Sequence, residues 1–158
     1  NNPSEELQLL AVRKNYDAIK FIKEPYESVQ KEAVTISYDA LRYIASPTYD
    51  VELIGIKKDE RAIRLINDLD KNKILEFLKV NFLVFKYVMK EISKNELEEV
   101  LKEALSNEDV KDQYVRDFLN STIDNNPNGM DIDKLMFIYQ YGSKKAKKIA
   151  VDEKLKMK

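Results

Sequence analysis

The sequence predicts an all-α protein, built as a right-handed, α-solenoid-like stack of short helix–turn–helix repeats with a C-terminal helical cap. Three observations support this fold class. Four segments of the chain align with a period of about 22 residues, within the range typical of repeat proteins. Within each segment the apolar residues recur three or four positions apart, which is the period of an amphipathic helix. Hydrophobic residues make up 44% of the chain and charged residues 35%, with three glycines, a composition typical of helical globular domains.

The four segments share side-chain chemistry column by column. Segments 1 to 4 span residues 3–24, 25–46, 47–68 and 69–90. The first column is proline in segments 1 to 3, and two other columns hold small residues in those segments: Ala11, Ala33 and Gly55, and then Ala18, Ala40 and Ala62. Small residues allow neighbouring helices to approach closely, so we expect the segments to stack and bury a shared apolar stripe.

Each segment is expected to form two short helices. In segment 1 they are marked by the apolar residues Leu7, Leu10 and Ala11, and then by Ala18, Ile19 and Ile22. Proline is favoured at the first helical position, so Pro3 and Pro47 are predicted to open the first helices of segments 1 and 3. Asn2 and Ser46 would then be the N-caps, and Glu5 would complete a capping box after Asn2.

Segment 4 departs from the pattern because Phe77 and Val84 replace the small residues. We therefore expect this segment to splay, or to fuse into one longer helix over about 71–91. Residues 1–91 are predicted to hold the four repeats, and residues 92–158 to form a helical cap within the same compact domain.

The region beyond Glu91 loses the period of the repeats. SKNE at Ser93 and SNED at Ser106 both match the capping-box pattern, which predicts helices near 94–105 and 107–122. A loop follows at DNNPNG, and a last helix is expected from about Asp131.

The motif P-S-E-E-x-Q-x-x-A-V followed by Y-D-A-I-K-F-I resembles a known group of short tandem α-helical repeats. These repeats, of about 22 residues each, are found in bacteriophage and bacterial proteins of unknown function. The resemblance covers about residues 2–90 and is clearest in segments 1 and 2. It implies an all-helical repeat fold and a phage or bacterial origin. A phage-encoded inhibitor or accessory factor acting on a host protein is one function that it suggests, and it carries no catalytic motif that could be transferred.

The chain contains neither cysteine nor histidine. Disulfides, thiolate chemistry, imidazole-dependent catalytic triads and the usual zinc sites are therefore excluded. No apolar run approaches the roughly 20 residues that a helix needs to span a bilayer. We expect a non-enzymatic cytoplasmic protein that uses no cofactor and no metal, and that does not associate with membranes.

Basic residues form a column that is cationic in every segment: Lys20, Arg42, Arg64 and Lys86. In segment 3 Arg61 takes the place of an aspartate, which gives a positive patch made of Lys57, Lys58, Arg61 and Arg64. Such a surface can bind an acidic partner or a phosphate backbone. A solvated face is the alternative, because Asp17 and Asp39 lie three residues before Lys20 and Arg42 and can pair with them.

Aromatic residues offer a second set of candidate contacts. Tyr26 and Tyr49 lie near the starts of segments 2 and 3 and are the candidates for exposed partner contacts. The aromatic residues within the helices, such as Tyr38 and Phe21, are expected to serve mainly in packing. The leading hypothesis is binding of another macromolecule, with a protein as the preferred partner, through the grooved face of the stacked helices.

The C-terminal tail suggests an alternative function, nucleic-acid binding, together with the Lys57–Arg64 patch. Its candidate contacts are Lys144, Lys145, Lys147 and Lys148, because the stretch 144–158 holds seven lysines. Residues 91–143 carry 12 acidic and 5 basic residues, so the tail could equally lie on the protein's own acidic segment.

The string DNNPNGMDID resembles the first half of a calcium-binding EF-hand loop, with Asp124, Asn126 and Asn128 at ligand positions. The second half does not match, because Leu135 stands where the loop requires a glutamate. A surface turn is therefore the preferred interpretation.

Overall fold

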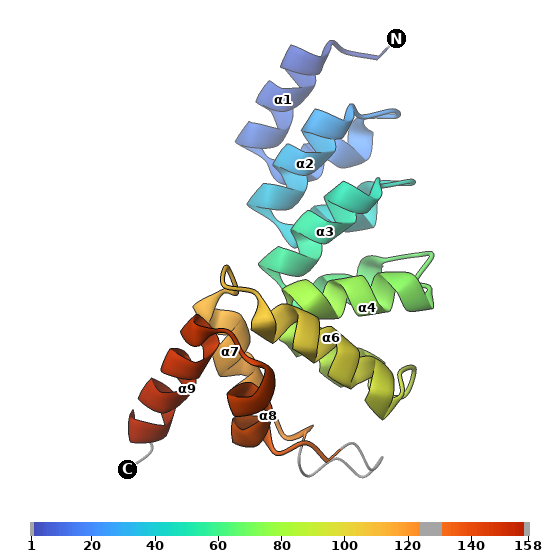
Figure 1. Cartoon of the computed structure of the whole chain (residues 1–158). Coiled ribbons are helices and arrows are strands. Elements are labelled where there is room, and N and C mark those ends of the chain that lie inside the picture. The colour runs from blue at the N-terminus through green and yellow to red at the C-terminus, as the bar shows by residue number, and fades with distance from the viewer. Residues whose placement is uncertain (1, 124–130, 157–158) are drawn as a thin grey trace. The chain divides into compact units, whose positions relative to one another are not determined.

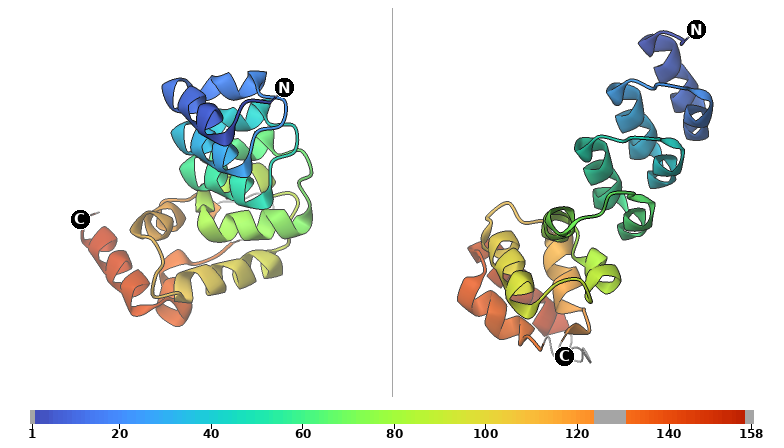
Figure 2. Two further views of the ribbon diagram at one scale, coloured as in Figure 1. Left: turned by 90° about the horizontal axis from the view of Figure 1, so that it is seen from above. Right: turned by 90° about the vertical axis from the view of Figure 1, so that its right-hand side faces the viewer.

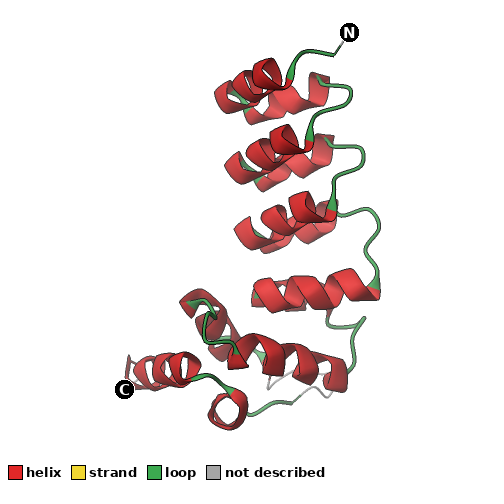
Figure 3. Ribbon diagram, turned by 45° about the horizontal axis from the view of Figure 1, so that its top comes forward, coloured by secondary structure: helices red, strands yellow, loops and turns green. Residues whose placement is uncertain are grey.

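The structure is a computed structural model that describes residues 2–123 and 131–156. Within these ranges every regular element is a helix and none is a strand (Figures 1 and 3), so the all-α prediction is confirmed. The chain divides into two compact units, Asn1–Leu69 and Asp70–Lys158. Unit 1 therefore holds segments 1 to 3, and segment 4 belongs to unit 2.

Unit 1 contains three α-helices, and each is followed by a six-residue 3-10 helix. The elements are α1 (Glu5–Lys14), η1 (Tyr16–Phe21), α2 (Glu27–Ile36), η2 (Tyr38–Tyr43), α3 (Tyr49–Lys58) and η3 (Glu60–Leu65). Corresponding elements recur at the spacing of the sequence segments. Successive α-helices contact each other, as do successive 3-10 helices, so unit 1 has two layers (Figure 2).

A short polar residue separates the two helices of each segment. Asn15, Ser37 and Asp59 occupy this position with extended backbone, which ends the preceding α-helix. The backbone N–H of each of these residues donates to the carbonyl oxygen four residues earlier, in the last turn of the α-helix. The side chain of each accepts a hydrogen bond from the backbone N–H two residues later. One residue is thus the C-cap of one helix and the N-cap of the next.

The predicted helix starts are wrong by two residues. The N-caps are Ser4 and Thr48, whose side chains accept from backbone N–H groups in the first turn. Pro3 lies just before its cap. Asn2 instead donates from Nδ2 to the carbonyl oxygen of Glu24, at 2.9 Å. Proline at the position before the cap still fits, because its missing N–H is not needed there.

A buried glutamine links segment 1 to segment 2. The side chain of Gln8 is 1% exposed. Its Nε2 donates to the carbonyl oxygen of Pro3 at 2.9 Å, and its Oε1 accepts from the backbone N–H of Tyr26 at 3.2 Å. Gln30, at the same position in segment 2, donates from Nε2 to the carbonyl oxygen of Pro25 at 3.1 Å. We call the two hydrogen bonds of the Gln8 side chain the glutamine clamp, which was not predicted from the sequence.

The small-residue columns do mark close contacts inside unit 1. A Cβ atom added to Gly55 would lie 2.6 Å from Cδ1 of Leu41 and 3.4 Å from Cγ1 of Val34. Both neighbours belong to segment 2, so α3 approaches that segment more closely than a larger side chain would allow.

Unit 2 begins with segment 4 and continues through the helices of the C-terminal part of the chain. Its elements are α4 (Lys71–Val80), η4 (Phe82–Val84), α5 (Phe85–Val88), α6 (Lys94–Ser106), α7 (Asp112–Leu119), α8 (Lys134–Tyr141) and α9 (Lys144–Lys156). The predicted long helix over 71–91 is wrong. Asn81 ends α4 and caps η4 with its side chain, as Asn15 does in segment 1.

The helix predicted from Ser93 is confirmed, and it carries a full capping box with Glu96. The helix predicted near 107–122 is present as α7, but its predicted start is wrong, because Asn107 forms a turn by accepting from the backbone N–H of Asp109 at 2.8 Å and α7 begins at Asp112. The single last helix predicted from about Asp131 is two helices in the structure. Gly142 separates α8 from α9, and its missing Cβ would lie 2.6 Å from the carbonyl oxygen of Ile138.

The core of unit 2 is aromatic. The ring of Phe118 meets Phe82 edge-on at 5.5 Å and Phe137 at 6.1 Å between ring centroids. The hydroxyl of Tyr114 donates to the carbonyl oxygen of Leu78 at 2.6 Å. Phe77, which breaks the small-residue column, is fully buried. Phe82 of segment 4 therefore packs in an aromatic cluster with Tyr114 and Phe118 of α7.

Candidate protein-binding surfaces

The basic column of unit 1 lies on the 3-10 helices, and its cations are paired with neighbouring acids. Lys20 Nζ lies 3.5 Å from Oδ2 of Asp17. Arg42 contacts Oδ1 of Asp39 through both Nε and Nη2, and this contact raises the pKa of Arg42 above its ordinary value. The charge of the column is therefore largely compensated where it was predicted to be cationic.

Segment 3 shows the same compensation in a different pattern. Arg61 Nη2 lies 2.7 Å from Oδ2 of Asp59, and this hydrogen-bonded pairing raises the pKa of Arg61. The guanidinium of Arg61 also lies 5.5 Å from the ring centroid of Tyr38, in segment 2. Arg64 occupies the last turn of η3. A cation and an aromatic ring from adjacent segments thus form one contact.

A second cation–aromatic contact lies one segment earlier. Lys20 Nζ lies 5.1 Å from the ring centroid of Phe21 and 5.7 Å from that of Tyr43. Phe21 is 81% exposed, although an aromatic residue at this position was expected to pack. We use the term cation–aromatic ridge for the surface formed by Lys20, Tyr38, Arg42, Tyr43 and Arg61.

The remaining predicted residues belong to other elements of the chain. Lys57 and Lys58 are exposed in the last turn of α3, where cations interact favourably with the helix dipole. Tyr26 is 50% exposed just before α2, and Tyr49 is 39% exposed at the start of α3. Lys86 belongs to unit 2, where its Nζ lies 5.2 Å from the ring centroid of Tyr87.

The lysine-rich tail is the helix α9, which packs against α7 in the acidic part of unit 2. Its apolar side, Ala146, Ile149 and Ala150, is buried. Arg116 of α7 contacts Glu153 at 3.1 Å, and Lys145 lies 3.4 Å from Asp112.

The exposed side of α9 carries Lys144, Lys147 and Lys148, while Lys145 is half-buried. The interpretation that the tail lies on its own acidic segment is therefore supported.

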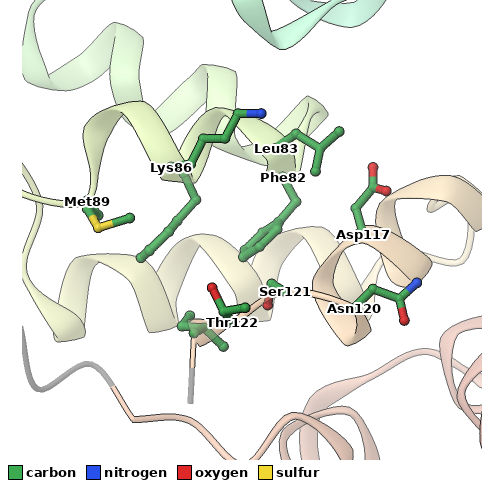
Figure 4. A pocket seen from close by; sticks show the side chains of 10 residues that line it. Phe82, Leu83, Lys86, Met89, Asp117, Asn120, Ser121 and Thr122 are labelled. Carbon is green, nitrogen blue, oxygen red and sulfur yellow. The ribbon is translucent and has the colours of Figure 1, made fainter. Parts of the chain in front are cut away.

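Unit 2 also contains a cavity of about 330 Å³ between η4, α5 and the end of α7. Phe82, Phe85 and Met89 form its apolar lining. Lys86 and Asp117, which carry opposite charges, also line it (Figure 4). The volume lies at the lower end of the range for small-ligand sites.

The described residues show no group of three or more acidic side chains placed to hold a metal ion. Most of the EF-hand-like string, from Asp124 to Met130, lies outside the described residues. In the same described part of the chain, no helix is both long enough and apolar enough to cross a membrane.

Comparison of the chain with protein-family models, with curated proteins and with solved structures found no match in any of the three. The surfaces described above therefore carry the functional argument on their own.

Proposed function

We propose that this chain is a non-enzymatic helical-repeat scaffold that binds a protein partner through the cation–aromatic ridge. The repeats would form the right-handed α-solenoid-like stack that the sequence predicts. The observation that supports the proposal is the ridge itself, in which basic and tyrosine side chains from successive segments contact one another. Arginine and aromatic residues are enriched in protein–protein interfaces and dominate their binding energy.

The charge pattern of the ridge favours a protein partner over a nucleic acid. Lys20, Arg42 and Arg61 each have an aspartate oxygen within 3.5 Å. A phosphate backbone binds by releasing counterions from uncompensated cations, and here the cations already have acidic neighbours. A protein surface with mixed charge can exchange these pairs for pairs of its own.

The scaffold beneath the ridge holds its side chains in place. Ile19, Leu41 and Ile63 anchor the three 3-10 helices, and each is at most 4% exposed. Since these helices are already ordered, binding would cost little additional conformational entropy. A host-directed inhibitor or accessory factor remains the version of this function that the resemblance to phage repeats suggests.

Nucleic-acid binding is the alternative, and the exposure of Lys57, Lys58, Lys147 and Lys148 is the observation that favours it. Binding of this kind would weaken steeply with salt. It would use the Lys57–Arg64 patch, which shares Arg61 with the ridge, but it would also depend on the lysines of α9, which the protein-binding proposal does not use.

The test uses two matched double variants, each of which removes two cations. Arg42→Ser with Arg61→Ser alters the ridge, where both side chains are more than half exposed. Lys147→Ser with Lys148→Ser alters α9. A partner is captured from a lysate of the source cell with the wild-type chain, purified, and titrated against all three proteins by calorimetry. We expect the ridge variant to bind at least about tenfold more weakly and the α9 variant to bind as the wild type does.

Equal binding by the ridge variant would contradict the proposal. So would salt-sensitive association with DNA or RNA, measured by fluorescence anisotropy at two salt concentrations, that is lost in the α9 variant.

A further inference from the structure

The cavity between η4, α5 and the end of α7 has an apolar wall that the core of unit 2 holds in place. Phe82, Phe85 and Ile123 belong to this wall, and all three are buried. The rings of Phe82 and Phe85 stack with 5.7 Å between their centroids. Phe82 also meets Phe118 edge-on, which fixes its ring against the rest of the core. The apolar part of the cavity is therefore already formed in the free chain.

The polar side of the cavity is held in place by hydrogen bonds. Asp117 Oδ1 accepts from Nε2 of Gln113 at 2.9 Å, which orients the carboxylate. The hydroxyl of Ser121 donates to the carbonyl oxygen of Phe118 at 2.6 Å. The carbonyl oxygen of Ser121 accepts from Nζ of Lys134, also at 2.6 Å. A ligand would therefore meet polar groups that are already positioned, so that binding would order few further side chains.

Two of the described residues that line the cavity carry opposite charges, Lys86 and Asp117 (Figure 4). Lys86 is exposed, and its Nζ lies 5.2 Å from the ring centroid of Tyr87. An ammonium group has three donors, so Lys86 can bind a carboxylate while it keeps this contact. A carboxylate has about four lone-pair sites, so Asp117 can accept from an ammonium group while it keeps its bond to Gln113.

We propose that this cavity binds a free amino acid with an apolar side chain. The apolar side chain of the ligand packs against Phe82 and Phe85, its carboxylate binds Lys86, and its ammonium group binds Asp117. The two charges of the cavity favour a zwitterion over a singly charged ligand. An anion would have Asp117 as a like-charged neighbour, and a cation would have Lys86. The volume of about 330 Å³ lies near the lower end of the range for small-ligand sites, which favours a compact ligand.

The cavity is independent of the proposed partner-binding surface, because it belongs to unit 2 and the cation–aromatic ridge belongs to unit 1. A chain that does not bind amino acids can still bind a protein through the ridge, and the reverse also holds. Failure of either proposal would leave the other standing.

Four probes separate the features of the ligand. L-Phenylalanine has the apolar side chain and both charges, phenylpropionate lacks the ammonium group, phenethylamine lacks the carboxylate, and glycine lacks the apolar side chain. Each probe is titrated up to about 10 mM into the isotope-labelled full chain, a range that suits the weak affinities of very small ligands. The chemical shifts of the backbone amides report both the affinity and the place of binding.

We expect saturable shifts with L-phenylalanine at residues 82–89 and 117–123. Each of the other three probes should bind at least about fivefold more weakly, because it lacks one of the three interactions.

Two variants assign each charged group of the ligand to a residue. Lys86→Met removes the cation and keeps a long side chain, and Asp117→Asn removes the anion and keeps an oxygen for Gln113. Lys86→Met should bind L-phenylalanine no better than phenethylamine, because the carboxylate has lost its partner. Asp117→Asn should bind L-phenylalanine no better than phenylpropionate. A structural defect would weaken all the probes alike, so the preference between probes separates binding from folding.

The matched controls are Lys90→Met and Asp109→Asn, which make the same changes at exposed residues that do not line the cavity. Both should bind the four probes as the wild type does. The proposal is overturned if L-phenylalanine gives no saturable shift up to about 10 mM, or if its shifts fall outside the two stretches. It is also overturned if the Lys86→Met and Asp117→Asn variants keep the preferences of the wild type.

Discussion

Units 1 and 2 are stabilised in different ways, although segment 4 carries the same repeat pattern as segments 1 to 3 in much of its length. In unit 1 the linking contacts join neighbouring segments, as between Gln8 and Tyr26, which are 18 residues apart. In unit 2 they join distant helices, as between Arg116 and Glu153, which are 37 residues apart. Contacts between neighbouring segments are typical of repeat proteins, whereas the contacts of unit 2 tie together parts of the chain that are far apart in sequence.

The small-residue column that begins with Ala11 shows where the packing of the two units diverges. Ala11, Ala33 and Gly55 keep this position small in unit 1, and in unit 2 the position holds the buried Phe77. The side chain at this position thus changes in size between the segments of unit 1 and the segment that belongs to unit 2. The predictions below test this contrast, from the largest expected effect to the smallest.

Truncation of the aromatic core should have the largest effect. Phe118→Ala removes a fully buried ring that meets two others, and we expect unfolding free energy to fall by about 3–5 kcal/mol. Urea unfolding followed by circular dichroism measures the change. Tyr139→Ala is the matched control, because its ring is 74% exposed. Similar losses for the two variants would show that Phe118 is not central to unit 2.

A larger side chain in the small-residue column should lower the stability by an amount that depends on the segment. Gly55→Val places atoms against Leu41 and Val34, and overpacking of this kind costs about 1–3 kcal/mol. Ala11→Val, at the same position in segment 1, should cost less than about 1 kcal/mol, because Ala11 is exposed. Thermal and urea unfolding of the two variants compare them directly. Equal costs would mean that segments 1 and 3 do not differ in how this position is covered.

The glutamine clamp should contribute measurably to unit 1. Gln8→Met keeps the bulk of the side chain but leaves the Pro3 carbonyl and the Tyr26 N–H without their partner. We expect a loss of about 1–2 kcal/mol. Gln113→Met is the control, since Gln113 is exposed and bonds to the nearby Asp117. If both variants unfold at the same urea concentration, the clamp does not stabilise the array.

Alkaline pH should weaken unit 2 through Tyr114. Burial raises the pKa of the Tyr114 hydroxyl well above its ordinary value of about 10. The unfolded chain therefore releases this proton as pH rises through about 10 while the folded chain keeps it, so this contribution is complete below pH 10 and is lost above it. The slope approaches about 1.4 kcal/mol per pH unit.

Tyr114→Phe removes this ionisation, and the other tyrosines act as an internal control because they remain in both proteins. Urea unfolding at intervals between about pH 8 and pH 11 should show a steeper decline for the wild type. Parallel declines would show that Tyr114 does not resist ionisation in the folded chain.

The helical columns of unit 1 could be predicted from the sequence because their apolar and small residues recur at a fixed spacing. The helix type and starts could not, because they depend on which polar side chain accepts a particular backbone N–H. Ser4, for example, caps α1 although Asn2 matched the capping pattern equally well. Asn81 likewise ends a helix that the apolar period alone would continue.

The candidate surface was predicted in part. The basic column and its pairing with Asp17 and Asp39 follow from three-residue spacing. The contacts of Lys20 with Tyr43 and of Arg61 with Tyr38 join different segments, so they depend on how the segments pack. A signal for the glutamine clamp was present in the sequence, since Gln8 and Gln30 occupy one column within an apolar stripe.

Amide hydrogen exchange tests most directly the claim that unit 1 is stabilised by contacts between neighbouring segments. Exchange of α1, residues 5–14, is compared with that of α2 in the same sample, because α2 contacts both α1 and α3. We predict that α1 exchanges faster than α2. Equal exchange of the two helices would contradict the account.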